Sequence, residues 1–194
     1  MISFFSRKRK IVLDTSVFIN PDVRKYFGKS PENAIEEFTR LAKKNKKFDF
    51  YMPPSVLKEL LNFIDEKKIP SDFYSILRIK SPNKHRIVCP SIFFYDLVEE
   101  IRTRVNKGLR VAENAVKSVS QKGIDETIKD VRKKYREALR EGIIDSKEDV
   151  DLIFLSFELK GTLVTGDQGL IIWADKLGVE WILPDKFRDF LLYK

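Results

Sequence analysis

The chain has 194 residues, of which 43% are hydrophobic and 34% are charged, a composition that favours a soluble globular protein of one domain with an appendage. Lysine and arginine outnumber aspartate and glutamate by 37 to 29, and the formal net charge is +8. This excess favours a polyanionic partner, nucleic acid first and an acidic membrane surface second. No apolar run reaches membrane-spanning length, and a single cysteine excludes an intramolecular disulfide, so we expect a cytoplasmic protein without a membrane segment.

Short runs of β-branched and aromatic residues alternate with longer helical patterns along most of the chain. This alternation is typical of an α/β domain with a central, mainly parallel sheet flanked by helices. Apolar residues at three- and four-residue spacing predict helices over residues 31–43 and 55–66. The predicted strands are residues 10–13, 48–52, 86–89, 162–165 and 180–183.

The middle of the chain has helical periodicity and no strand signal. We expect helices over residues 93–119 and 124–140 with a turn between them, which form an inserted, protruding αα-hairpin. The chain then divides into one domain of residues 1–91 and 141–194 and an insert of residues 92–140. Residues 102–140 contain twelve basic and five acidic side chains. The hairpin therefore carries most of the excess charge, although a charge run can also be only a solvated helix face.

Two aspartates follow predicted strands. Asp14 comes after the strand at 10–13, and Asp167 closes the strand at 162–165 after one glycine. In a parallel sheet both emerge at the carboxyl ends of strands, where open α/β sheets place their sites. The alternative is that each aspartate caps the turn or helix that follows it.

Further carboxylates open an apolar helix near residue 150. Asp145 and Asp149 are four residues apart and share a face if both are helical. Asp145 and Glu148 also fit a capping box, and Asp151 ranks below Asp149 because a regular helix turns it elsewhere. Converging carboxylates repel one another unless a cation neutralises them. Magnesium or manganese suits such oxygen ligands and can activate water for phosphoryl displacement.

These residues resemble the four ordered acidic motifs of PIN-domain ribonucleases. The motifs are VLDTS at 12–16, EL at 59–60, Asp149 before an apolar helix, and TLVTGD at 162–167. With the basic hairpin before the third motif, the whole chain resembles the HARP family of minimal, protein-only ribonuclease P, also known as RNA ligase partner proteins. The resemblance implies a metal-dependent endonuclease that removes the 5′ leader of precursor tRNA and leaves a 5′-phosphate.

The resemblance also implies roles for individual residues. Four aspartates would hold the metal ions and position the attacking water: Asp14, Asp145, Asp149 and Asp167. Supporting candidates are Asp151, Glu59, Thr15, Ser16 and Thr165, of which the hydroxyls can orient carboxylates or a metal-bound water. Glu59 matches the PIN pattern but fits an exposed helix face equally well.

The hairpin residues expected to contact RNA are Arg132, Arg136, Lys133, Lys134 and Arg140. Arg132 and Arg136 are four residues apart, so both guanidinium groups can reach one stretch of RNA backbone. The resemblance further implies a homo-oligomer of dimers joined through the hairpins, of the dodecamer type.

Two other functions stay open on the sequence alone. One is a different PIN ribonuclease, for example a toxin-like enzyme that cuts mRNA or mature tRNA; the basic hairpin disfavours it. The other is a non-catalytic RNA-binding partner of an RNA ligase, in which the acidic residues are only structural. The retained set of four carboxylates disfavours that reading.

Overall fold

The structure is a computed structural model that describes residues 8–140, 144 and 146–193. Its packing divides the chain into two compact units. The sheet unit contains the described residues up to Val88 and from Ser146 onward, and the hairpin unit contains Cys89 to the end of the second long helix. No helix in the described part of the chain is long and apolar enough to cross a lipid bilayer.

The sheet unit is built on five parallel strands, as the sequence predicted for its fold class. The strands lie in the order β3-β2-β1-β4-β5, so β1 is central. Their bounds are β1 Arg9–Leu13, β2 Phe48–Met52, β3 Leu77–Ile79, β4 Thr162–Val164 and β5 Trp181–Ile182. Val12 is in register with Tyr51 of β2 on one side and Leu163 of β4 on the other.

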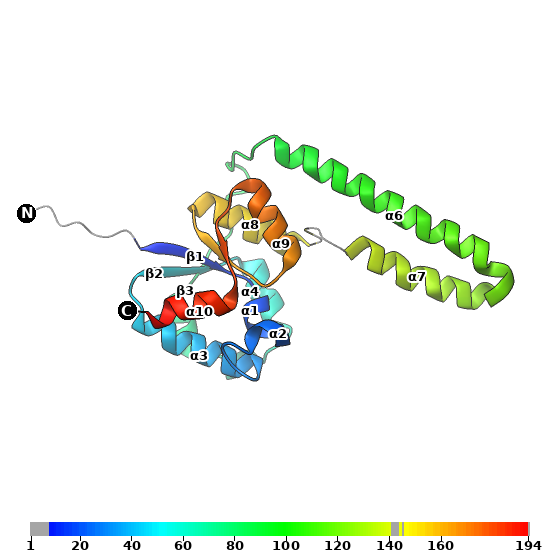
Figure 1. Cartoon of the computed structure of the whole chain (residues 1–194). Coiled ribbons are helices and arrows are strands. Elements are labelled where there is room, and N and C mark those ends of the chain that lie inside the picture. The colour runs from blue at the N-terminus through cyan, green and yellow to red at the C-terminus, as the bar shows by residue number, and fades with distance from the viewer. Residues whose placement is uncertain (1–7, 141–143, 145, 194) are drawn as a thin grey trace, which may run out of the picture. The chain divides into compact units, whose positions relative to one another are not determined.

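Helices cover both faces of this sheet. Figure 1 shows α3 and α10 on one side of the strands and α8 on the other. The helices of this unit are α1 Ser16–Ile19, α2 Pro21–Arg24, α3 Pro31–Lys44, α4 Pro54–Leu61, α5 Ser71–Ile76, α8 Lys147–Leu159, α9 Gln168–Leu177 and α10 Pro184–Leu192, with a 3-10 turn at Glu66–Lys68. Helix α8 packs against β1, β4, α4 and α9.

An aromatic cluster fills the core between α3 and the sheet. Phe38 of α3 is fully buried and meets Phe50 of β2 edge to face, with the ring centroids 5.2 Å apart. Phe18, Phe73 and Phe187 surround the same ring from α1, α5 and α10. Rings in this geometry attract one another beyond the burial of their area. The core therefore fixes the short helices after β1 against the sheet.

Two predicted elements are wrong. Residues 86–89 do not form a strand: residues 84–86 form a turn, and Val88 is 85% exposed. The third strand is instead β3, which follows α5 directly and pairs with β2. The helix predicted over 55–66 ends at Leu61, and Asp65 caps a separate 3-10 turn through its side chain.

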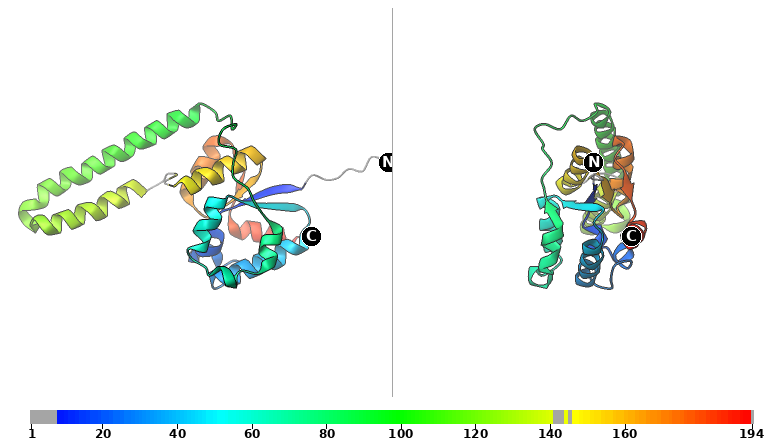
Figure 2. Two further views of the ribbon diagram at one scale, coloured as in Figure 1. Left: turned by 180° about the vertical axis from the view of Figure 1, so that it is seen from behind. Right: turned by 90° about the vertical axis from the view of Figure 1, so that its left-hand side faces the viewer.

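The hairpin unit consists of two long helices, α6 Ile92–Lys122 and α7 Ile124–Arg140 (Figure 2). Gly123 joins them with a φ of +80°, a backbone conformation that residues with a Cβ atom rarely adopt. A Cβ at Gly108 would lie 2.5 Å from the Tyr135 ring, so α6 approaches α7 closely at this point. The two helices thus form an antiparallel pair with their own contacts.

Candidate active site

The carboxyl ends of β1 and β4 lie side by side at the point where the chain changes direction in the sheet. From β1 the chain continues to β2 and β3, and then crosses to β4 on the other side of β1. The backbone N–H of Asp14 donates to Val164 O at 3.1 Å, which holds the two strand ends together. Such a switch point is where open α/β sheets bind ligands.

Asp14 is a buried carboxylate held by hydroxyl groups. Only 5% of the residue is exposed, and its Oδ2 accepts hydrogen bonds from Ser16 Oγ and from Thr165 Oγ1, the latter at 2.7 Å. Ser16 Oγ also accepts the Gly166 N–H at 3.1 Å. The Asp14 carboxyl also accepts a backbone hydrogen bond from Ser16, the first residue of α1, so the capping alternative considered for this residue is present as well. Asp14 is thereby oriented by residues from both strand ends.

Asp167 caps the helix that follows β4. Its Oδ1 accepts the Leu170 N–H at 3.0 Å, and its own N–H donates to Thr165 Oγ1 at 3.0 Å. The capping alternative considered for this residue is thus present, and it uses one of the two carboxylate oxygens. The negative charge of Asp167 reaches Asp14 and raises the pKa of that carboxyl.

Glu59 reaches the same region from α4. Thr15 Oγ1 lies 3.4 Å from both Asp14 Oδ1 and Glu59 Oε2, so the hydroxyl sits between the two carboxylates. Partial burial raises the pKa of Glu59, and the charges of Asp14 and Glu148 raise it further. Glu59 therefore belongs to the acidic cluster and not to an exposed helix face.

Helix α8 begins at Lys147 with Ser146 as its cap, one residue later than the capping box that we expected. Ser146 Oγ accepts the Asp149 N–H at 3.0 Å, so Asp149 occupies the first turn of α8. Asp145 lies outside the described residues. Asp151 is turned to another face, where its Oδ1 lies 2.6 Å from Lys84 Nζ.

The acidic cluster has the chemistry of a divalent-cation site. Burial is the main cause that raises the pKa of Asp14, with hydrogen bonds from Ser16 and Thr165 opposing it. Among the described residues, no three His, Cys, Asp or Glu side chains converge closely enough to hold a metal ion. The hard oxygen donors and their mutual repulsion nevertheless fit magnesium or manganese, because a cation would offset the cost of ionising them together.

Glu148 is a further carboxylate whose charge reaches Glu59, and its sequence pattern did not predict a place near the site. Its charge raises the pKa of Glu59 although the two residues are far apart in the sequence. The sequence around Glu148 indicates only a helix start, where this residue fits a capping box. Its role depends on the approach of α8 to α4, which is a tertiary contact.

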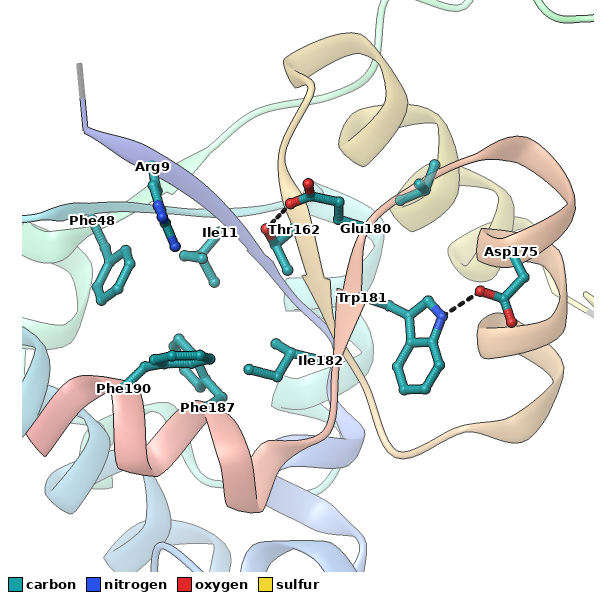
Figure 3. Close-up of a pocket in the computed structure, with 11 residues that line it drawn as sticks. Arg9, Ile11, Phe48, Thr162, Asp175, Glu180, Trp181, Ile182, Phe187 and Phe190 are labelled. Carbon is teal, nitrogen blue, oxygen red and sulfur yellow. Dashed lines mark hydrogen bonds between the residues drawn. The ribbon is translucent and has the colours of Figure 1, made fainter. Parts of the chain in front are cut away.

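A hollow of about 360 Å³ lies elsewhere in the sheet unit. Figure 3 shows its lining, with Arg9 and Phe48 from the starts of β1 and β2, and Phe187 and Phe190 from α10. These strand starts are at the opposite end of the sheet from Asp14. The hollow is mostly apolar and lacks the carboxylate cluster, so it is separate from the candidate active site.

The basic residues predicted to contact RNA lie on α7. Arg132, Lys133, Lys134 and Arg136 are all exposed, and the side chain of Arg140 lies outside the described part of the chain. Arg136 Nε donates to the backbone carbonyl of Arg132 at 3.0 Å, and the residue as a whole is exposed. These side chains are accessible to a polyanion.

A family model described as PINc domain ribonuclease matches residues 10–193. The chain belongs to this ribonuclease family. The match covers the strand ends, the acidic cluster and the hairpin together, and it confirms the PIN-type fold. PIN-domain ribonucleases use divalent metal ions, in keeping with the oxygen donors around Asp14.

Individual relatives narrow the family to HARP. A protein of Thermodesulfovibrio yellowstonii named RNA-free ribonuclease P is 73% identical over 99% of this chain and 98% of its own length. Proteins of the same name from Pyrococcus horikoshii and a Hydrogenobaculum species are 45% and 43% identical over 94% of this chain, and these matches cover 91% and 98% of the relatives. The resemblance to HARP ribonucleases noted in the sequence is thereby confirmed.

The buried hydroxyl of Thr165 provides a test of the site. Thr165→Val keeps the side-chain shape but removes the donor to Asp14 and the acceptor for the Asp167 N–H. We expect divalent-metal affinity, measured by calorimetry, to fall by about tenfold, because Asp14 and Asp167 both lose a hydrogen bond that holds them in place.

The matched control for this test is Thr39→Val. Thr39 is also a buried threonine, and its hydroxyl bonds to the Ile35 carbonyl within α3, away from the carboxylates. Equal metal affinity in both variants and the unmodified protein would show that Thr165 does not support the site.

Proposed function

We propose that the chain is an RNA-free ribonuclease P, an endonuclease that removes the 5′ leader from precursor tRNA. The observation that carries this proposal is the 73% identity to a protein of that name over nearly the full length of both chains. The acidic cluster around Asp14 and the basic helix α7 supply the two features that such an enzyme needs. The carboxylates serve the chemistry, and the basic side chains hold phosphates.

The reaction is hydrolysis of one phosphodiester. The oxygen of a water molecule bonds to the phosphorus, the bond from phosphorus to the leader's 3′ oxygen breaks, and that oxygen takes up a proton. The mature tRNA keeps a 5′-phosphate, and the leader leaves with a 3′-hydroxyl. A bound divalent cation supplies positive charge for the phosphate oxygens and lowers the pKa of water.

We assign the cation to Asp14, Asp145, Asp149 and Asp167, with Mg²⁺ or Mn²⁺ as the ion. Asp14 and Asp167 extend from neighbouring strand ends, and Asp149 stands in the first turn of α8. Thr15, Ser16 and Thr165 orient Asp14 through their hydroxyls, and Thr165 Oγ1 accepts the backbone N–H of Asp167, so that these two aspartates keep their positions when the cation and the RNA bind. Glu59 and Asp151 are supporting residues.

We assign the RNA grip to the hairpin unit. Residues 102–140 carry twelve basic and five acidic side chains, and the four described basic residues between 132 and 136 are exposed. Contacts between basic side chains and phosphates release counterions, so binding weakens as the salt concentration rises. The hairpin therefore provides affinity for RNA without reading its base sequence.

Replacing Arg132 and Arg136 by alanine should weaken precursor tRNA binding at low salt. The plot of log affinity against log salt should also become less steep by about two charges. Filter binding at several salt concentrations measures both effects. A Lys67→Ala/Lys186→Ala variant, which loses the same charge from exposed positions of the sheet unit, is the control. If both double variants lose the same RNA affinity, α7 does not provide the RNA-binding surface.

We further propose a cytoplasmic homo-oligomer of dimers, of the dodecamer type, joined through the hairpins. Exposed apolar residues on α6 support this assembly, among them Val98, Ile101, Val105 and Leu109, which recur at three- and four-residue spacing. Light scattering of the purified full chain should then give a multiple of the 22.7 kDa chain mass. A monomer at micromolar concentration would contradict the assembly.

Substrate choice separates ribonuclease P from other PIN ribonucleases. The purified chain should cut precursor tRNA and leave mature tRNA and an unstructured mRNA fragment intact under the same conditions. Cleavage of mature tRNA or mRNA at comparable rates would favour a toxin-like ribonuclease. Binding of precursor tRNA without cleavage would favour the RNA ligase partner.

A further inference from the structure

An ion pair between the buried Asp151 of α8 and the exposed Lys84 joins, together with Ser55, three separate segments of the sheet unit. Asp151 Oδ1 lies 2.6 Å from Lys84 Nζ, and Asp151 Oδ2 accepts a hydrogen bond of 2.7 Å from Ser55 Oγ. The Asp151 side chain is 7% exposed and that of Lys84 is 55% exposed, so the carboxylate is shielded from bulk water while the lysine is partly open to it. Asp151 Oδ2 thus accepts a hydrogen bond, and Oδ1 is ion-paired with Lys84 without forming a hydrogen bond.

The Lys84 side of this contact belongs to a strap, residues 80–84, which follows β3 and runs along α8. Lys80 forms an ion pair with Glu158, whose other oxygen accepts the Asn83 N–H at 2.6 Å. Glu158 and Asp151 are seven residues apart, which places them on one face of α8 two turns apart. The strap thus contacts α8 at two positions, Glu158 and Asp151. Lys84 makes the contact at Asp151, which is the one nearer the acidic cluster.

The Ser55 side of the contact belongs to α4, which packs against α8. Ser55 and Glu59 are one turn apart in α4, while Asp151 and Glu148 are one turn apart in α8. Glu59 Oε2 lies 3.4 Å from Thr15 Oγ1, which lies 3.4 Å from Asp14 Oδ1 as well. The hydrogen bond between Ser55 and Asp151 therefore joins the helix that carries Glu59 to the helix that carries Asp149.

We propose that Asp151 is a positioning residue and not a metal ligand. With Lys84 and Ser55 it holds α4 against α8, and this contact keeps Glu59 and Asp149 in place around the divalent cation. The inference rests on the metal-dependent function proposed above. This role replaces metal binding by Asp151, because its Oδ2 accepts the Ser55 hydrogen bond and its Oδ1 is ion-paired with Lys84.

Binding of Mn²⁺ to the full chain without RNA, followed by electron paramagnetic resonance, tests the proposal independently of cleavage. Lys84→Met is the decisive variant because it leaves the Asp151 carboxylate in place. We expect Lys84→Met and Asp151→Asn each to weaken Mn²⁺ affinity by about tenfold. Ser55→Ala should also weaken Mn²⁺ affinity. Lys84→Arg, which keeps the positive charge, should bind Mn²⁺ as well as the unmodified chain does.

The matched control is Lys80→Met, which removes an ion pair on the same strap and helix but leaves the contacts of Asp151 intact. Thermal melting confirms that each variant is folded. If Asp151→Asn alone weakens Mn²⁺ binding, Asp151 is a ligand and the proposal is overturned. Unchanged affinity in all variants, or no Mn²⁺ binding by the unmodified chain, would also overturn it. Precursor tRNA cleavage, recorded separately, shows whether the proposed function itself stands.

Discussion

Asp149→Asn should lower the rate of precursor tRNA cleavage by at least about a hundredfold and leave RNA binding unchanged. The side-chain shape is retained, and the Asp149 N–H still reaches Ser146 Oγ, so α8 begins as before. What is lost is one negative oxygen donor for the cation. Single-turnover cleavage and filter binding on the same preparation measure the two quantities.

Asp189→Asn is the control for this change. Asp189 is an exposed aspartate on α10 in the same unit, and replacing it removes the same charge from the protein. We expect wild-type cleavage from this variant. Cleavage by Asp149→Asn at the wild-type rate would show that Asp149 is not part of the active site. If RNA binding is lost together with cleavage, the variant is misfolded and the loss is not one of chemistry.

Asp14→Asn should abolish cleavage and at the same time stabilise the metal-free fold at neutral pH. Burial raises the pKa of Asp14, so the folded chain holds its proton more tightly than the unfolded chain. The free energy of unfolding therefore falls as pH rises above the ordinary aspartate value of about 4, and asparagine removes this loss. Thermal melting in EDTA should show this gain in stability as a higher melting temperature for Asp14→Asn, by about 2–4 °C for each kcal/mol gained.

Two comparisons make the Asp14 prediction specific. Mg²⁺ should raise the melting temperature of the wild-type chain and not that of Asp14→Asn, because ligand binding stabilises only a fold that binds it. Glu37→Gln should behave in the opposite way: a hydrogen bond from Arg40 lowers the pKa of Glu37, so its stabilisation is present at neutral pH and fades as pH falls. A metal-free Asp14→Asn variant that is less stable than wild type at neutral pH would contradict the account.

Local patterns were sufficient to predict the strands that carry the site. β1 ends in the apolar run Ile11-Val12-Leu13 and β4 is the short run Thr162–Val164, and their parallel pairing brings Asp14 and Asp167 to the carboxyl edge of the sheet. β3 was missed because it is a three-residue edge strand that follows α5 without a turn. The run at 86–89 had strand-like residues but no neighbouring strand, and only tertiary packing shows that difference.

The rest of the site depends on contacts between distant segments. Glu148 has the local pattern of a capping residue, and its effect on Glu59 arises only when α8 lies against α4. Lys84 likewise stands in a loop without any motif, yet it pairs with Asp151. Periodicity and motif spacing report faces of single elements. They do not report which charged side chains meet between elements, and so these two residues had no signal in the sequence.

Cleavage of a 5′-labelled precursor tRNA by the purified chain, in Mg²⁺ and in EDTA, tests the central claim most directly. The account predicts one cut at the mature 5′ end, a 5′-phosphate on the product tRNA, and no cleavage in EDTA or with Asp149→Asn. Cuts at other positions, or a cut that persists in EDTA, would contradict a metal-dependent ribonuclease P built on the carboxylates around Asp14.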